Sequence, residues 1–242
     1  MIQVGFKSDK GLRRTNNEDA YFVVPSDNIY MVADGVGGNN AGEIASRTAV
    51  SVIAEYIREN PVTDKKTEAE LKEYFMQCLV KANTEIYGMA RRHQENRGMA
   101  TTIILVYVAG KQAYVVNVGD SRMYVCRNGL MSCITEDHTY VTELLKQGLI
   151  TAQQAKNHPQ RNMITRAIGG DATVQPDFFR VELEEGDVLM LCTDGLYDEV
   201  EESKMAGIIG ESESMSDACR CLVNAANRSG GRDNITVVCL KI

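Results

Sequence analysis

The stretch TIILVYVAGKQAYVVNVGDSRMYVCRNGLMSCI, residues 102–134, decides the fold class, because it is apolar and β-branched and is interrupted only by short turns. The turns at 109–112 and 127–129 are much shorter than the roughly dozen residues that a parallel crossover needs, so the strands they join must be antiparallel neighbours. The runs that we expect to form strands lie at about 102–108, 113–118, 123–126 and 130–134.

Further strands are expected at about 174–183, 188–193 and 235–241, and the Glu-Glu-Gly-Asp segment at 184–187 is interpreted as another hairpin turn. Several of these runs are apolar at successive positions, which is typical of strands that are covered on both faces. We therefore expect stacked antiparallel sheets rather than one sheet with a solvent-facing side.

Three helices are predicted around these strands. The first spans about 41–58 with an apolar stripe at helical spacing, and the second begins at Thr67, where Thr67 and Glu70 fit a capping box. A shorter helix is expected at about 216–227. Helices that flank antiparallel strands without regular alternation indicate an α+β fold, a four-layer α/β/β/α sandwich with two central antiparallel sheets.

Residues 137–170 do not fit that pattern, because they combine short helical pieces, two glycine stops and a His-Pro pair between strands. We expect this segment to be an inserted flap on the surface. No Pro/Ser-rich linker divides the chain, so residues 1–242 are expected to form a single catalytic domain.

The charge balance limits the possible partners. The chain has 33 acidic and 26 basic side chains, a formal net charge of −7, and no Lys/Arg-rich run of the kind that follows a phosphate backbone. Nucleic acid is therefore not an expected partner. A protein this acidic can handle phosphate only through local cations, which are a few arginines or metal ions.

Cysteine usage and hydropathy indicate the compartment. The seven cysteines include no Cys-x-x-Cys pair, so we expect reduced, mostly buried thiols rather than a zinc site or a disulfide framework. No apolar run is long enough for a signal peptide or a membrane span. The sequence thus predicts a soluble, cytoplasmic monomer with no membrane partner.

A second informative stretch is MVADGVGGNN, residues 31–40, where an apolar run ends at Asp34 and opens into glycines. The glycines can hold a phosphate on backbone amides, or they can let the chain turn sharply beside a metal-binding carboxylate. The spacing is not Gly-x-Gly-x-x-Gly, because Asn40 stands at the third glycine position, and no Gly-Lys-Ser/Thr follows. A similar arrangement, VLMLCTDGLYD, recurs at 188–198.

Four aspartates stand at the ends of apolar strands: Asp34, Asp120, Asp194 and Asp233. Each one alone can be ordinary turn chemistry. Together, buried side by side, they would repel one another or protonate unless cations lay between them. Oxygen-only ligands suit Mg²⁺ or Mn²⁺, and none of the three histidines lies near these motifs, which disfavours zinc.

The amino-terminal segment SDKGLRRTNNEDAY, residues 8–21, adds two arginines and two acids. An arginine beside acids commonly forms a surface ion pair. Beside a metal cluster, however, its planar fork is suited to hold a phosphate monoester.

Taken together, these segments resemble the metal-dependent protein serine/threonine phosphatases of the PPM, or type-2C, family, and in particular their compact bacterial members. The matching pieces occur in family order over nearly the whole chain. They are RTNNEDA (14–20), ADGVGG (33–38), AGEIAS (41–46), NVGDSR (117–122), HPQRNMITRAIGG (158–170), CTDGLYD (192–198) and GGRDNITVV (230–238).

The resemblance implies roles for individual residues. Asp34 corresponds to the carboxylate that bridges two metal ions, and the Gly35 carbonyl to a ligand of the second ion. Asp194 and Asp233 correspond to ligands of the first ion. Arg14, five residues before Asp19 as the family pattern requires, corresponds to the phosphate-binding arginine, whereas Arg13 is out of register.

The remaining acids correspond to weaker or indirect positions. Glu18 and Asp19 match outer-sphere acids that hold metal ions through water. Asp120, and Asp198 with a less secure correspondence, match a third, weaker metal site. The cofactors implied are thus two Mn²⁺ or Mg²⁺ ions in the core site and a third weaker ion.

The implied reaction is the hydrolysis of phosphoserine and phosphothreonine in proteins by direct attack of a water that bridges the two ions. Animal members carry a histidine directly after the Asp-Gly pair, and here that position is Val36, which cannot transfer a proton. A metal-bound water or a flap group such as His158 would then have to protonate the leaving group.

The expected partners are phosphorylated proteins, including a cognate serine/threonine kinase and its substrates in bacterial signalling. Two alternatives stay open at this point. One is a non-catalytic relative that binds phosphoproteins without hydrolysing them. The other is a regulatory phosphatase of one narrow substrate.

Overall fold

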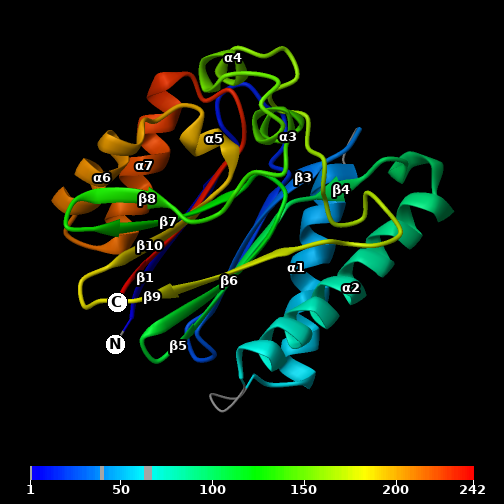
Figure 1. Cartoon of the computed structure of the whole chain (residues 1–242), viewed down its shortest axis with the longest axis horizontal. Coiled ribbons are helices and arrows are strands. Elements are labelled where there is room, and N and C mark those ends of the chain that lie inside the picture. Colours follow the sequence, from blue (N-terminus) through cyan, green and yellow to red (C-terminus); the bar gives the residue numbers. More distant parts are fainter. Residues whose placement is uncertain (1, 39–40, 63–66) are drawn as a thin grey trace.

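The structure, a computed structural model, describes residues 2–38, 41–62 and 67–242, and it contains two antiparallel sheets stacked between layers of helices (Figure 1). This confirms the expected α+β class. The first sheet has five strands, in the order β1 (Gln3–Asp9), β11 (Ile235–Lys241), β10 (Val188–Cys192), β7 (Arg122–Arg127) and β8 (Leu130–Cys133).

The second sheet has six strands. Its main order is β2 (Asp19–Val24), β3 (Ile29–Val36), β5 (Ile103–Ala109), β6 (Gln112–Val118) and β9 (Asp177–Glu182), and the short β4 (Ala100–Thr101) pairs with the end of β3. All of these pairings are antiparallel.

The two short turns of residues 102–134 make hairpins as predicted, β5–β6 and β7–β8. The hairpin predicted at 184–187 is wrong, because β9 pairs with β6 in the second sheet whereas β10 pairs with β7 and β11 in the first. A short turn between two apolar strands can cross from one sheet to the sheet stacked about 10 Å away as easily as it can return within one sheet. The strand expected at 174–183 is also shorter, 177–182.

The three predicted helices are present. Helices α1 (Ala41–Glu59) and α2 (Glu68–Arg92) cover the outer face of the second sheet, and α7 (Met215–Ser229) covers the first together with α6 (Glu202–Glu211), which the sequence did not predict. The capping box is formed, since Glu70 N donates to Thr67 Oγ1 at 3.3 Å and Thr67 N donates to the Glu70 carboxylate at 2.7 Å. A single 3-10 turn, η1 (Gln94–Asn96), follows α2.

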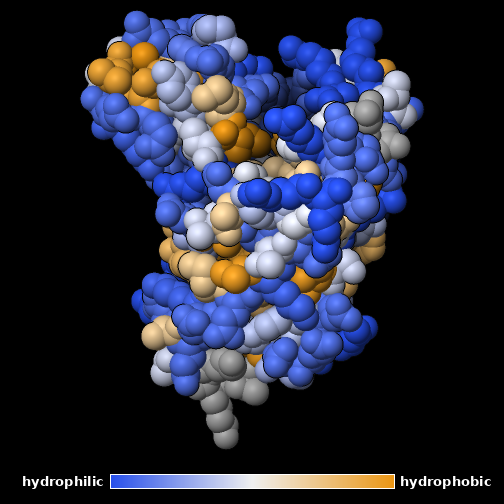
Figure 2. Space-filling model, turned by 90° about the vertical axis from the view of Figure 1, so that its right-hand side faces the viewer, coloured by the Kyte–Doolittle hydropathy of each residue, from blue (hydrophilic) through white to orange (hydrophobic). Residues whose placement is uncertain are grey.

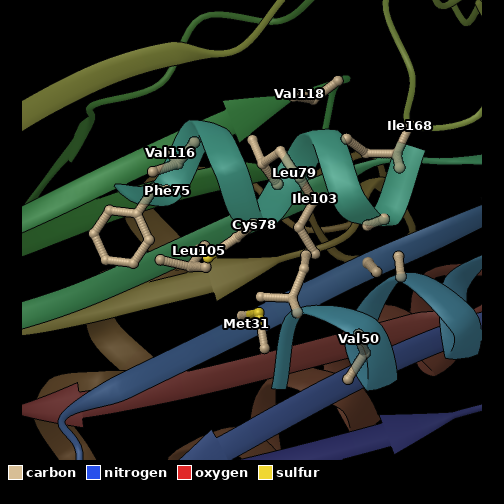
Figure 3. Close-up of a cluster of buried hydrophobic side chains, with 14 of the residues drawn as sticks. Met31, Val50, Phe75, Cys78, Leu79, Ile103, Leu105, Val116, Val118 and Ile168 are labelled. Carbon is tan, nitrogen blue, oxygen red and sulfur yellow. The ribbon is translucent and has the colours of Figure 1, made fainter. Parts of the chain in front are cut away.

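The hydrophobic core has three layers, which explains the strands that are apolar at successive positions. In β3, Met31 packs under α1 and α2 with Phe75 and Leu79 (Figure 3), whereas its neighbours Tyr30 and Val32 pack between the two sheets. A third layer lies between the first sheet and helices α6 and α7. Side chains of central strands such as β5 and β10 are therefore buried on either face, whereas those of β1 and β8 are partly exposed.

The segment 137–170, called the flap below, holds α3 (Tyr140–Lys146) and α4 (Ala152–Lys156) and lies at one end of the sheets, at the top of Figure 1. Two isolated bridges, Thr139 to Ile164 and Thr101 to Ile168, tie it to itself and to the end of β4. The short helix α5 (Asp194–Tyr197) lies at the same end. Within the described part of the chain no helix is long and apolar enough to cross a membrane.

Candidate active site

Strand pairing brings the first two candidate acids together. In the antiparallel β2–β3 pair, Asp19 lies directly opposite Asp34. The backbone of Asp34 is held by the next segment, because its N–H donates to Thr102 Oγ1 at 2.9 Å and its carbonyl accepts from Thr101 Oγ1 at 2.8 Å. Asp34 thus stands on a rigid strand end rather than on a free loop.

The other sheet supplies Asp194 and Asp233. Asp194 begins α5 directly after β10, and Asp233 lies just before β11, the neighbour of β10. Arg14 reaches the same place, where its Nη2 donates to Asp233 Oδ2 at 2.7 Å. The structure therefore joins residues from both sheets and from the amino-terminal segment at one end of the sandwich.

Asp19 is held by two hydroxyl groups that the sequence did not single out. Thr193 Oγ1 donates to Asp19 Oδ2 at 2.9 Å, and Thr236 Oγ1 donates to the same oxygen at 2.7 Å. Both threonines lie inside quoted motifs, but a hydroxyl has no periodicity or charge signal that predicts its partner. They fix one oxygen of Asp19 and leave the other free.

Glu18 is positioned mainly through its backbone. Its N–H donates to Asn234 Oδ1 at 2.8 Å, and its carbonyl accepts from Ser46 Oγ at 2.5 Å. Asn234 also donates to the carbonyls of Lys10 and Asn16, each at 2.9 Å. Asn234 thus ties the amino-terminal segment to the start of β11, a role that the sequence analysis did not predict.

The carboxylates share one electrostatic environment. Burial, followed by the charge of Asp19, raises the pKa of Asp34 well above its usual range. Burial raises the pKa of Asp19 and of Asp194 to about 7 in each case, with the neighbouring aspartates adding to the shift. Burial and the charge of Asp194 raise the pKa of Asp120 to about 8. Like charges in a low-dielectric site disfavour ionisation in this way unless a cation compensates them.

Two buried carboxylate oxygens in this group, Oδ1 of Asp19 and Oδ1 of Asp194, have no hydrogen-bond partner among the residues that the structure describes. In residues 2–38, 41–62 and 67–242, no three His, Cys, Asp or Glu side chains are already arranged as a metal cluster. The donor set is nevertheless all oxygen, and two of its members lack partners. Such a set fits hard divalent cations of the Mg²⁺ or Mn²⁺ type.

Gly35 is required for packing rather than for a turn, which corrects the role expected for the glycines there. It lies inside β3, where a Cβ atom would be 2.0 Å from the Gly42 carbonyl oxygen in the first turn of α1 and 2.6 Å from the Glu18 carbonyl oxygen. No real Cβ approaches so closely. The absence of a side chain lets β3 and α1 touch beside Asp34.

Asp120 and Asp198 lie on the flap side of this group. A cavity of about 770 Å³ there is lined by both of them and by Asp194, and also by flap residues such as Arg161. Asp198 Oδ2 accepts from Arg161 Nη2 at 3.1 Å. Figure 2 shows the molecule hollowed at the corresponding upper end, where Figure 1 places α3 and α4.

The other residues that the sequence analysis discussed lie apart from this group. Val36 is 43% exposed at the end of β3, next to Gly35. His158 is on the flap, where its Nδ1 accepts from Gln160 N at 3.1 Å. The Arg13 side chain is exposed, whereas its backbone N–H donates to the Gly231 carbonyl.

The seven cysteines are all free thiols. Five are buried, whereas Cys133 is exposed and Cys221 is partly exposed. They belong to the sheets and helices rather than to the acidic group.

Comparison with known proteins identifies the family of the chain. A family model described as "Protein phosphatase 2C" matches residues 12–229. The chain is 37% identical over 236 residues to the "Serine/threonine phosphatase stp" of Listeria innocua. This match covers 96% of this chain and 93% of that protein.

Two solved structures show the same fold. The S. agalactiae serine/threonine phosphatase aligns with a TM-score of 0.92 at 33% identity over 100% of both chains. The catalytic domain of the serine/threonine protein phosphatase PstP, solved in complex with 2 manganese ions, aligns with a TM-score of 0.85 at 31% identity over 99% of this chain and 97% of that chain. With the family match over most of its length, the chain belongs to the protein phosphatase 2C family and is a protein serine/threonine phosphatase.

Proposed function

We propose that this phosphatase hydrolyses phosphoserine and phosphothreonine with two divalent ions, Mn²⁺ or Mg²⁺, and that the whole chain acts as one catalytic domain. The residues that would hold the ions are Asp34, the Gly35 carbonyl, Asp194 and Asp233. The observation that carries this proposal is the partnerless buried oxygen of Asp194, set among aspartates that raise one another's pKa. The PstP catalytic domain with its manganese ions supports it.

When bound, ions of this kind supply a nucleophilic water at neutral pH and positive charge beside the phosphoryl group. The protein's part is to hold the acids before the reaction begins. Asp34 is locked by the threonines at 101 and 102, and Asp19 by those at 193 and 236. A fixed site loses little energy to reorganisation during the reaction.

Glu18 and Asp19 would act one layer further out, through water. The free Oδ1 of Asp19 is buried and available to such a water, because Oδ2 alone takes both threonine hydrogen bonds. Outer carboxylates of this kind orient the inner ligands and tune the bound ion.

Arg14 is the substrate-binding residue in this proposal. Its side chain is 48% exposed and spends one donor on Asp233, so further N–H groups of the guanidinium remain for a phosphate. An arginine fork pairs with two phosphate oxygens at once. Arg14 thus connects the metal ligands to the substrate.

A third, weaker ion would be held by Asp120, with Asp198 as a further ligand. Asp120 is buried beside the acidic group, where the charge of Asp194 helps to raise its pKa. Asp198 Oδ2 accepts from Arg161 in this structure, and the second carboxylate oxygen, Oδ1, is the one that would bind an ion. Val36 offers no proton, and the structure places no histidine against Asp34 among the described residues.

The substrates in this proposal are phosphorylated proteins, including those of a cognate serine/threonine kinase. The relatives from Listeria and S. agalactiae are serine/threonine phosphatases, which supports this class of substrate. A phosphatase of a single regulatory substrate would use the same site, and a panel of phosphopeptides separates the two cases.

The test uses purified enzyme with Mn²⁺, p-nitrophenyl phosphate and a phosphothreonine peptide. EDTA should abolish both activities, and added Mn²⁺ should restore them. Arg14→Ala should raise KM for both substrates about tenfold or more, because a hydrogen bond to a charged group contributes about 1.5–3 kcal/mol. Arg13→Ala, which removes the neighbouring exposed guanidinium, is the matched control. Full activity in EDTA would contradict the proposed metal mechanism.

A further inference from the structure

The turn that carries Asp120 is held by side chains from distant segments. Tyr197, the last residue of α5, donates its hydroxyl hydrogen to the Asp120 carbonyl at 2.8 Å. On the other side, Gly119 N donates to His138 Nδ1 at 3.1 Å, and His138 N donates to the Gly119 carbonyl at 3.0 Å. Three backbone groups of the Gly119–Asp120 turn are thus occupied by these two residues.

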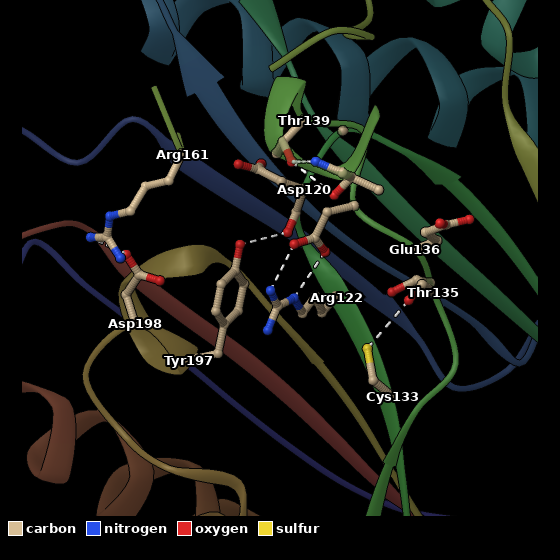
Figure 4. A network of polar contacts seen from close by, with 12 residues as sticks. Asp120, Arg122, Cys133, Thr135, Glu136, Thr139, Arg161, Tyr197 and Asp198 are labelled. Carbon is tan, nitrogen blue, oxygen red and sulfur yellow. Dashed lines mark hydrogen bonds and ion pairs between the residues drawn. The ribbon is translucent and has the colours of Figure 1, made fainter. Parts of the chain in front are cut away.

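Tyr197 is itself fixed by a charged group. The Arg122 guanidinium lies 3.7 Å from the centre of the Tyr197 ring, and it donates two hydrogen bonds to the Asp137 carboxylate, at 2.9 and 2.7 Å. Arg122 also donates to Tyr124 Oη at 3.1 Å. Figure 4 shows the Tyr197 hydroxyl directed toward Asp120 and its ring beside the Arg122 guanidinium, with the hydrogen bonds of the network as dashed lines.

The His138 ring is likewise held by hydrogen bonds at both of its nitrogens. It is 1% exposed, and its Nε2 lies 3.1 Å from Asp177 Oδ2 at the start of β9. Because Gly119 N–H can only donate, Nδ1 must be the acceptor, and the ring proton therefore sits on Nε2 and points to Asp177. Arg166 donates to the other Asp177 oxygen at 3.0 Å and completes the support.

We propose that Tyr197 and His138 are positioning residues that set the place of Asp120, and so the affinity of the weakest metal ion. This inference rests on the third ion of the proposed function. Asp137 and His138 are also the first two residues of the flap. The position of Asp120 is therefore tied to the base of the flap. A displacement of Asp137 would move Asp120 through Arg122 and Tyr197, and a displacement of His138 would move it directly, so either one would change the affinity for the weakest ion.

The physical reason is that a single carboxylate ligand on a turn binds well only if the turn is held. Residues that orient metal ligands typically change metal affinity by about 10–100-fold when they are removed. The tight ions use Asp34, Asp194 and Asp233, none of which lies on the Gly119–Asp120 turn. Asp194 shares α5 with Tyr197, but Tyr197→Phe keeps the ring and removes only the hydroxyl. Loss of the Tyr197 or His138 contact should thus weaken one ion and leave the others bound.

The experiment compares Tyr197→Phe with Tyr124→Phe in the full chain. Both remove one hydroxyl from the same network, but only Tyr197 reaches Asp120. Calorimetric titration with Mn²⁺ alone should show the two tight ions unchanged in both variants and the weakest ion about tenfold weaker in Tyr197→Phe only. With p-nitrophenyl phosphate, Tyr197→Phe should lower kcat at limiting Mn²⁺ with little change in KM, and high Mn²⁺ should restore it.

His138 offers a second comparison, between His138→Asn and His138→Gln. The Asn side-chain oxygen can take the position of Nδ1 and keep the Gly119 bond, whereas Gln reaches toward Asp177 and leaves Gly119 N–H without its acceptor. We expect normal affinity for the weakest ion in His138→Asn and reduced affinity in His138→Gln. Thermal unfolding without metal establishes that each variant is folded.

The outcomes separate this inference from the proposed function. Equal affinities in Tyr197→Phe and wild type, with a third ion present in both, overturn the positioning role and leave the metal mechanism intact. A wild-type titration with only two ions overturns the third site and this inference with it. Loss of all ions in Tyr197→Phe, in a folded protein, also contradicts the inference, because the contact would then serve the whole site.

Discussion

At the scale of single residues, Gly35 shows how packing and chemistry coincide. A glycine after Asp34 was expected to allow a sharp turn, but the strand continues to Val36, and the constraint comes from the Gly42 carbonyl. The same backbone that touches α1 carries the carbonyl proposed as a metal ligand. A substitution there must move either the helix or the ligand.

Gly35→Ala should therefore lower both stability and activity. The added Cβ would meet the Gly42 oxygen at 2.0 Å, and forced overpacking of this kind typically costs about 1–3 kcal/mol. Gly38→Ala is the matched control, because a Cβ there meets no atom of the described residues within 4 Å. Thermal unfolding and phosphatase assays of the two variants give the comparison. Equal melting temperatures for the two variants would contradict the prediction, because they would show that α1 can shift away from the added Cβ without loss of stability.

At the residue scale, the sequence singled out the acids, whose roles as metal ligands stay predictions, but it did not single out the residues that support them. Asp34, Asp194 and Asp233 end or precede apolar strands, a signal that a single sequence carries. Thr193 and Thr236 lie 174 and 217 residues from Asp19, and no local pattern reports a hydrogen bond over that separation. The ordered motifs contained these residues, but only the folded chain gives them a partner.

At the scale of elements, an ion pair ties the end of β7 to the connection between the two sheets. Arg127, at the end of β7, donates to both oxygens of Asp187, at 2.8 and 2.7 Å, in the connection between β9 and β10. Asp187 Oδ2 also accepts from Glu184 N at 2.8 Å. Asp187 is 1% exposed, whereas the Arg127 side chain is 35% exposed, so a buried carboxylate is paired with a partly exposed guanidinium.

Asp187 should make stability depend on pH in the acid range. Burial raises the pKa of Asp187, but the Arg127 and Glu184 hydrogen bonds outweigh that effect and hold it below its usual value. A depressed folded-state pKa contributes stability above the unfolded-state pKa of about 4, and this stability is lost as pH falls through the folded value. Asp187→Asn should thus unfold more readily at pH 7 than wild type.

Below about pH 3 the difference between Asp187→Asn and wild type should shrink, because the wild-type carboxyl is then protonated too. Urea titrations at several pH values measure it. Glu185→Gln is the control, because Glu185 is exposed and lies in the same turn as Asp187. A constant difference across all pH values would assign the effect to packing rather than to charge.

Elements were predicted well where periodicity was strong and poorly where it was not. The helices expected at α1, α2 and α7 and the β5–β6 hairpin were correct. Helix α6 was missed, since its ten residues include two glycines and only a weak stripe. The assignment of 184–187 as a hairpin was wrong, because a turn length does not say whether the chain stays in one sheet.

At the scale of the whole molecule, the site opposes the stability of the fold. Burial and mutual repulsion raise the pKa of Asp19, Asp34, Asp120 and Asp194, so without metal the folded state pays to keep them charged at neutral pH. A bound cation reverses the balance, since a ligand that binds only the folded state stabilises it.

Asp194→Asn should accordingly stabilise the metal-free protein and abolish most of its stabilisation by Mn²⁺. At pH 7.5 in EDTA its melting temperature should exceed that of wild type by a few degrees, at about 2–4 °C per kcal/mol for a chain of this size. In Mn²⁺ the order should reverse. Calorimetry of wild type and Asp194→Asn in both buffers gives the four melting temperatures. A lower melting temperature for Asp194→Asn than for wild type in EDTA would show that the wild-type carboxylate does not destabilise the metal-free fold.

The sequence by itself determined the antiparallel strands, three of the helices, the strand-end acids and the ordered motifs that indicate the family. These features are local, because burial alternation, turn length and capping act within a few residues. The tertiary structure alone decided which sheet each strand joins, why Gly35 cannot carry a side chain, and which groups hold Asp19 and the Asp120 turn. Those depend on contacts between segments far apart in the chain, which form only when the two sheets stack.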